Sequence, residues 1–429
     1  MMNSRFSKIS MAIVMAASPM SGVVYGANFE GPDSVENTIA EQKAQKKSWR
    51  ESLADDGITF GADYNALGLA SSNGSMGNDV DASSGVARFY GSWNLVGKET
   101  GNTGGIVWKV EHRHAYSDSA PKNLAFIDDT DRLFNNGTKE GVGYVGMIGS
   151  AFSDQGFRVT NLHWKQKFNG GKTSVIAGWQ DVTDYVDTYA LASPWSGFSN
   201  LAFSTGAGAM GLPDDGVLAL SAGHMLTDNY YVIAGIADAN GKSDDIFDGF
   251  NTLFDESDFF TTLELGWTAS QDQIFTDNFH ITAWHFDGGT RHSLSDATGG
   301  GESGKGINFS WSQFVTPQVM PFVRGGFSDG DVALYERSVS VGVGYFGLGS
   351  EKNNLGFAVN WSEINEYALK GISTGVYGND GEQFTAELYY NMQLNDFIQV
   401  TPDIQYIKDP AFSNESSAWV FGVRARVFI

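Results

Sequence analysis

The sequence predicts an all-β protein, a transmembrane antiparallel β-barrel of about 16 strands with a short N-terminal amphipathic helix. Three observations support this. Hydrophobicity alternates with a period of two from Ile58 onward, which is typical of strands. The connections between the expected strands alternate between short and long. Beyond the start of the chain, no segment has the roughly 20 apolar residues that a membrane helix needs, so any membrane crossing must use a closed sheet.

The last segment shows the alternation most clearly. One face carries only apolar residues: Trp419, Phe421, Val423, Ala425, Val427 and Ile429. The opposite face carries both arginines of the segment: Val420, Gly422, Arg424, Arg426 and Phe428. A wall with lipid outside and water inside fits this pattern. A soluble sandwich fits it too, because there the apolar face packs on a second sheet.

The whole set of strands separates these two alternatives. Most candidate strands have about the 9–11 residues of a tilted membrane strand, and their number is even, as in bacterial barrels. The sixteen candidates are residues 58–69, 85–96, 105–116, 158–168, 173–179, 217–225, 230–238, 259–268, 278–286, 306–314, 319–327, 338–346, 355–361, 384–394, 398–406 and 418–429.

The connections predict the orientation of the barrel. Short ones contain the Gly, Asn and Asp of tight turns and include residues 169–172, 227–229 and 395–397. Long ones include residues 117–157, 180–216, 239–258 and 362–383. A soluble sandwich has no reason to keep this alternation, whereas an outer-membrane barrel has short periplasmic turns and long external loops. The N-terminal helix and Ile429 are therefore expected on the periplasmic side.

The start of the chain is expected to be removed on export. Arg5 and Lys8 precede a short apolar stretch, Met11 to Ala17, so residues 1–26 are predicted to form a cleaved signal peptide. Residues 27–57 are predicted to form a periplasmic helix that lies below the barrel or plugs its mouth, and a partly disordered spacer is the alternative. Residues 58–429 are then the outer-membrane barrel.

Composition excludes several classes of function. The 429 residues contain 27 Lys and Arg, 50 Asp and Glu and no cysteine, for a net charge of −23. Such acidity argues against a nucleic-acid partner, and the lack of cysteine excludes disulfides, thiolate zinc sites and a cysteine nucleophile. No enzyme motif has the required context, although spacing alone cannot exclude a membrane-barrel hydrolase. We expect no enzyme, no cofactor and no metal site.

One pair of histidines is a candidate for metal binding. His112 and His114 lie two residues apart on one face of an expected strand. Spacing implies no third ligand, so polar side chains at a surface or interface are the favoured interpretation.

Alternation also assigns the side chains that face the lumen. Charges on the lipid face cost roughly 2–4 kcal/mol each near the midplane, so they are expected inside. There they either solvate the wall or filter small polar solutes. The pore-lining candidates are Arg88, Lys109, Glu111, Arg113, Lys165, Glu264, Arg324, Glu387, Asp403, Arg424 and Arg426.

Two long loops are strongly acidic. Residues 180–216 contain no Lys or Arg and are expected to fold into the pore, opposite the basic wall, with rings that could stack on sugars; an external loop is the alternative. The candidate constriction residues are Asp184, Tyr185, Asp187, Tyr189, Trp195 and Phe198. In residues 239–258 six acids outnumber Lys242, and such a loop could share divalent cations with lipopolysaccharide.

Three stretches resemble the carbohydrate-selective porin family of the OprB type. Trp49-Arg50-Glu51-Ser52-Leu53, with Gly57-Ile58 and Asp63-Tyr64, resembles the family's passage from a helix into the first strand. The run Thr401-Pro402-Asp403-Ile404-Gln405-Tyr406-Ile407, with Asp409-Pro410, resembles its penultimate strand. Arg424-Ala425-Arg426-Val427-Phe428 resembles its closing strand. The resemblance implies a sixteen-stranded channel for mono- and oligosaccharides, with Arg and Glu at a loop-narrowed eyelet.

Two features depart from that family. The chain ends in Ile429 instead of an aromatic residue, and the external loops are strongly acidic, which puts sugar preference in question. The resemblance and the polar lumen still favour passive diffusion of carbohydrates and other small polar solutes. A general cation-biased porin is the alternative, and a barrel enzyme or receptor is a less favoured one. The expected location is the outer membrane of a Gram-negative bacterium. Expected partners are outer-membrane lipid, lipopolysaccharide, the barrel-assembly machinery and small sugars; a homo-oligomer remains open.

Overall fold

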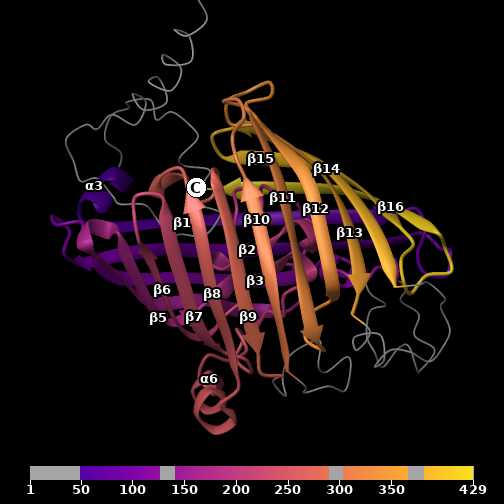
Figure 1. Cartoon of the computed structure of the whole chain (residues 1–429). Helices are drawn as coiled ribbons and strands as arrows, with labels where there is room; N and C mark the ends of the chain where they lie inside the picture. Colours follow the sequence, from indigo (N-terminus) through magenta and orange to yellow (C-terminus); the bar gives the residue numbers. More distant parts are fainter. Residues whose placement is uncertain (1–48, 126–140, 289–302, 366–380, 429) are drawn as a thin grey trace, which may run out of the picture.

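Sixteen antiparallel strands close into one barrel in the described part of the chain (Figure 1). The computed structural model describes residues 49–125, 141–288, 303–365 and 381–428. Each strand pairs with its neighbour in sequence, and β1 also pairs with β16, with Tyr64 opposite Val427. The barrel therefore has no free sheet edge, which is what a bilayer requires of a sheet.

The strands are β1 (Ile58–Ser71), β2 (Val80–Val96), β3 (Gly104–Ala115), β4 (Gly156–Phe168), β5 (Thr173–Gln180), β6 (Val217–Met225), β7 (Tyr230–Asp238), β8 (Phe259–Thr268), β9 (Asn278–Phe286), β10 (Gly304–Ser312), β11 (Val319–Gly330), β12 (Tyr335–Phe346), β13 (Asn354–Ile364), β14 (Glu382–Asn395), β15 (Ile398–Lys408) and β16 (Ser417–Phe428). The helical elements are short: α3 (Trp49–Asp55), α4 (Pro121–Leu124), α6 (Asp248–Asn251), the 3₁₀ turns η2 (Asn169–Gly171), η3 (Val182–Asp184), η4 (Leu201–Phe203), η5 (Thr205–Gly208) and η7 (Gln271–Gln273), and the π-helical turn η6 (Thr252–Glu256).

The predicted fold class is confirmed, and most strand ends lie within a few residues of expectation. The largest difference is at β2, which begins at Val80, not at residue 85. The extra residues, Val80 to Ser84, are mostly small or polar and give no apolar alternation, but they continue the ladder with β1 as far as Ser71. Helix α3 covers the end of the expected N-terminal helix, and residues 27–48 lie outside the described residues.

The two faces of the wall differ as the alternation predicts. On β16, Trp419, Phe421 and Val423 are exposed, whereas Arg424 and Arg426 are buried inside. The same contrast holds around the barrel, where the outward side chains include Leu220, Leu263, Ile281, Ile307, Phe357 and Leu388, all exposed. An exposed apolar belt over buried charges suits acyl chains outside and a polar interior. No helix among the described residues is both long and apolar enough to span a bilayer.

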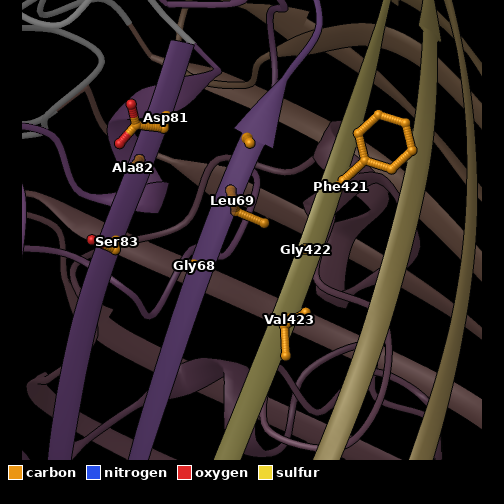
Figure 2. A pocket seen from close by; sticks show the side chains of 9 residues that line it. Gly68, Leu69, Asp81, Ala82, Ser83, Phe421, Gly422 and Val423 are labelled. Carbon is orange, nitrogen blue, oxygen red and sulfur yellow. The ribbon is translucent and has the colours of Figure 1, made fainter.

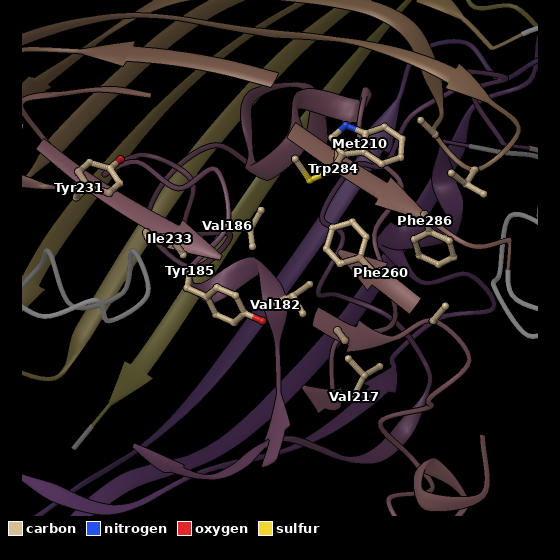
Figure 3. Packing of buried hydrophobic residues seen from close by; sticks show 14 of the residues in the cluster. Val182, Tyr185, Val186, Met210, Val217, Tyr231, Ile233, Phe260, Trp284 and Phe286 are labelled. Atoms are coloured by element: carbon tan, nitrogen blue, oxygen red, sulfur yellow. The ribbon is translucent and has the colours of Figure 1, made fainter. Parts of the chain in front are cut away.

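Loops, more than the walls, supply the apolar packing inside the barrel. Figure 3 shows Val182, Tyr185 and Met210 from the connection between β5 and β6. They pack against Phe260 of β8 and Trp284 of β9, whose side chains point inward. The interior is therefore partly filled by a folded loop, and this loop positions the candidate site.

Candidate functional site

The connection between β5 and β6, residues 181–216, crosses the interior of the barrel; we call it the constriction loop. It bonds to inward side chains of three distant strands. Arg324 of β11 donates to Asp187 (2.7 Å), Glu387 of β14 accepts from the Ser199 amide (2.6 Å), and Arg424 of β16 donates to the Gly197 carbonyl (2.8 Å). A closed barrel brings these groups together, although they are far apart in sequence.

Asp187 is the most deeply anchored residue of the loop. One carboxylate oxygen accepts from Arg324 and from the Gly206 amide at 2.7 Å, and the other lies 2.8 Å from His280 Nε2. The Arg324 guanidinium also lies 4.2 Å from the centre of the Tyr189 ring. All of these side chains are buried, so the charges are paired away from water, as a stable buried ion pair requires.

Two buried glutamates hold the loop by its backbone. Glu264 of β8 accepts from the Asp187 amide (2.9 Å), from Thr282 (2.8 Å) and from Tyr231 (3.0 Å). Glu387 accepts from the Ser199 and Asn200 amides, and the second of these bonds is 3.0 Å long. Wall carboxylates thus satisfy loop donors that have no partner within the loop.

A second segment, residues 141–155, lies inside with the constriction loop. Ile148 forms a β-bridge with Asn200, and the Gly149 amide donates to the Ser199 carbonyl (2.7 Å). Sequence reasoning missed this segment. Its composition was the available signal, because the run from Gly141 to Gly149 contains no charge and consists only of Gly and apolar or aromatic residues, which suits a buried loop.

One edge of the constriction loop faces the basic wall. Lys109 of β3 lies 3.0 Å from Asp184 and 3.7 Å from Asp181, and Asn161 of β4 donates to Asp184 (3.0 Å). The side chains of Lys109 and Asp184 keep 14% and 32% of their surface exposed. This edge is therefore more open than the Asp187 anchor, and its donors and acceptors are within reach of water.

A second group of charges lies beside this edge. Arg113 pairs with Glu111 and Asp215, both at 2.6 Å, and Arg158 pairs with Asp214 at 2.5 Å. Asp214 and Asp215 also belong to the constriction loop.

Two loop carboxyls have shifted pKa values. Burial and the nearby Asp184 raise the pKa of Asp181 to about 8, although Lys109 opposes the shift. Burial would raise the pKa of Asp215, but Arg113, Lys122 and Arg158 hold it well below the usual range. The constriction loop thus contains one carboxyl, Asp181, that titrates at about pH 8 and another, Asp215, that stays ionised.

Arg88 has a structural partner that sequence reasoning missed. Its guanidinium donates to Asp63 of β1 (2.8 Å) and lies 3.9 Å from the centre of the Trp195 ring. Arg426 of β16 donates to the same carboxylate (3.1 Å). Asp63 therefore joins strands on both sides of the barrel closure.

The remaining predicted wall residues are also inside. Lys165 is half-buried on β4, and buried Asp403 accepts from Gln405 on its own strand (3.0 Å). Most of the predicted pore-lining side chains therefore lie around the constriction loop, and many of them form ion pairs or hydrogen bonds with it.

The aromatic rings of the loop are not available to stack on sugars, as the sequence suggested they could. The side chains of Tyr185, Tyr189, Trp195 and Phe198 are all buried. Phe198 lies 5.0 Å from Tyr389, ring centre to ring centre, and Trp195 packs on Phe152 at 5.5 Å. They form the loop's own core, because a loop inside a barrel must bury apolar surface to hold a fixed shape.

The paired histidines lie on the outer face of β3. His114 Nε2 lies 3.0 Å from the Tyr64 hydroxyl, and the two histidine rings are 5.5 Å apart. No cluster of three metal-binding side chains occurs within the described ranges. Close by on this outer wall is a shallow pocket of mostly small residues on β1, β2 and β16, including Gly68, Ser83 and Val423 (Figure 2).

Comparison with known proteins identifies the family. The model of the "Carbohydrate-selective porin, OprB family" matches residues 70–427. This chain belongs to the OprB family of carbohydrate-selective porins. It is therefore an outer-membrane channel of the Gram-negative type, and both family and fold indicate a channel and not an enzyme.

Solved structures agree on the fold. The chain is similar to OprB of Pseudomonas putida in its high-pH structure, at 19% identity and a TM-score of 0.67, over 89% of this chain and 96% of that one. It is also similar to an anion-selective porin from Comamonas acidovorans, at 10% identity and a TM-score of 0.51, over 87% and 99%. No curated protein sequence matches the chain.

Proposed function

We propose that the chain mediates passive diffusion of carbohydrates and other small polar solutes past the edge of the constriction loop. The observation that carries this proposal is the grouping of Lys109, Asn161, Asp181 and Asp184, which are partly exposed or next to exposed groups. A sugar hydroxyl both donates and accepts hydrogen bonds. An ammonium group, an amide, the Asp184 carboxylate and the Asp181 carboxyl therefore complement a sugar better than a wall of one charge would.

The interactions at the edge of the constriction loop are weak enough for a passing solute to replace them. A solvent-exposed ion pair contributes only about 0–1 kcal/mol. The Lys109–Asp184 pair, with 14% and 32% of its side chains exposed, lies between an exposed and a buried pair, so a few hydrogen bonds of about 0.5–1.5 kcal/mol each can compete with it. Binding must stay weak for the solute to leave; a Kd of about 1 mM corresponds to about −4 kcal/mol. The buried Asp187 anchor would meanwhile hold the loop in place.

Block of ion current tests the proposal. In planar bilayers, adding a sugar that enters the edge should lower single-channel current in a concentration-dependent manner. Lys109→Met should weaken that block, because the variant lacks the donor. Lys352→Met is a matched control, since Lys352 pairs with Asp396 between two exposed turns (3.2 Å). Steady current across a panel of mono- and oligosaccharides would contradict the proposal.

A general cation-biased porin is the second candidate. The net charge of −23, together with Asp184, Asp214 and Asp215 on the loop, and with Asp181 above its pKa of about 8, favours cations near the passage. This candidate predicts cation-selective current that sugars do not block.

Two further predictions accompany the proposal. We propose export with cleavage of residues 1–26, which N-terminal sequencing of the mature protein checks. We also propose that the pore-lining candidates predicted from the sequence line the solute path. Lys109→Met tests this at one of them.

A further inference from the structure

Three phenylalanines protrude from the connection between β7 and β8. Phe247, Phe250 and Phe254 are 80%, 54% and 72% exposed. They lie three and four residues apart: Phe247 immediately precedes α6, Phe250 lies in α6 and Phe254 lies in η6, so their side chains emerge on one side of this helical stretch. External loops are expected to be polar, and a group of exposed aromatic rings marks a contact surface.

The protruding rings sit on an ordered support. Asn240 donates to Asp258 (2.9 Å), and the Ala239 amide donates to the Asp258 carbonyl (3.0 Å). The Thr252 hydroxyl donates to the buried Asp238 carboxylate. Ser243 donates from its amide to Asp214 of the constriction loop (2.9 Å). The connection is therefore tied at both ends and in its middle, so its fold exposes the rings.

The same connection covers the end of the outer wall. Trp179 of β5 pairs with Leu162 of β4, so both side chains point outward. Leu162 is 47% exposed, whereas Trp179 is 3% exposed. Residue Gly249 accounts for the difference, because a Cβ atom placed there would lie 2.4 Å from the Trp179 ring. Helix α6 thus rests on the last outward ring of the wall, and Figure 1 shows it beyond the strand ends, away from α3.

We infer that Phe247, Phe250 and Phe254 insert into the outer leaflet of the membrane. Continuity with the lipid-facing belt carries the inference, because the segment bearing the rings packs directly on Trp179 of that belt. An amphipathic segment at a membrane surface buries its rings just below the headgroups and keeps its charges in water. The charged residues of the whole connection between β7 and β8 are Lys242, Asp244, Asp245, Asp248, Asp255, Glu256 and Asp258.

The absence of cysteine from the sequence permits a clean test. A nitroxide spin label on Phe254→Cys, in vesicles of phosphatidylethanolamine and phosphatidylglycerol, reports its surroundings through collisions with oxygen and with a water-soluble nickel chelate. We expect oxygen to relax this label more than nickel does, as at Leu220→Cys on the lipid-facing wall. Asp255→Cys is the matched control on the same turn and should be relaxed more by nickel, because Asp255 is exposed and next to the ring.

Two results would overturn the inference. A label at residue 254 that favours nickel as strongly as the label at 255 would place the rings in water. A label shielded from both agents, with spin–spin broadening that disappears on dilution into lipid, would assign the surface to a second copy of the chain. Conductance of the labelled variants, measured in parallel, confirms that each barrel is folded.

Discussion

Replacing Arg324 by Met tests whether the constriction loop is held by its buried anchor. The arginine donates to Ser310 (2.6 Å) and to both the carboxylate and the carbonyl of Asp187 (2.7 Å each). Methionine fills much of the same space but donates nothing, so the Asp187 carboxylate keeps only His280 and the Gly206 amide. The constriction loop would then contain a buried Asp187 carboxylate without its guanidinium partner.

The expected cost follows from burial. Removing one partner of a buried ion pair costs about 3–5 kcal/mol. Arg337→Met is the matched control, because Arg337 pairs with Glu363 at 2.9 Å but with 56% and 32% of the side chains exposed. An exposed pair of this kind contributes about 0–1 kcal/mol.

Two measurements check this prediction. Guanidinium unfolding in detergent micelles, followed by tryptophan fluorescence, should show a loss of about 3 kcal/mol or more for Arg324→Met and about 1 kcal/mol or less for Arg337→Met. Single-channel recordings should show larger and noisier current for Arg324→Met alone, because a loosened loop narrows the passage less. Equal unfolding curves and equal conductance for the two variants would refute the anchoring role.

Three other predictions concern the edge of the loop and its far support. Lys109→Met should shift the reversal potential toward cation selectivity, because it removes the cation facing Asp181 and Asp184; an unchanged potential would place Lys109 off the ion path. Cation selectivity should rise as pH increases through about 8, where the Asp181 carboxyl ionises. Because the folded state holds that proton above the usual carboxyl pKa, its stability should fall between about pH 4 and 8 and then level off, and Asp181→Asn should abolish both trends. Arg424→Ala should raise conductance by freeing the Gly197 carbonyl, and conductance equal to wild type would show that the loop does not depend on this bond.

The walls of the barrel could be predicted from the sequence because their signal is local. Each strand shows its two environments within about ten residues, so alternation places Arg424 inside and Phe421 outside before any fold is known. The start of β2 was harder to predict, because the stretch from Val80 to Ser84 pairs by backbone bonds that any sequence can form.

The interior could be predicted only in part, because its contacts are long-range. Composition suggested that an acidic loop opposes basic walls, and the Lys109–Asp184 pair agrees with that expectation. No local pattern links Asp187 to Arg324, which lie 137 residues apart. Aromatic content suggested sugar stacking, but Tyr189 and Phe198 pack inside the loop, since burial depends on partners that the sequence alone does not place.

Current block by sugars tests the central claim most directly. With the wild-type channel open in a planar bilayer, stepwise addition of glucose or a short oligosaccharide should lower the ion current to a saturating minimum, with half-block at a concentration of about 1 mM or higher, as weak binding requires. An ion current that stays constant at every sugar concentration, in a channel that conducts normally, would contradict carbohydrate passage by this edge.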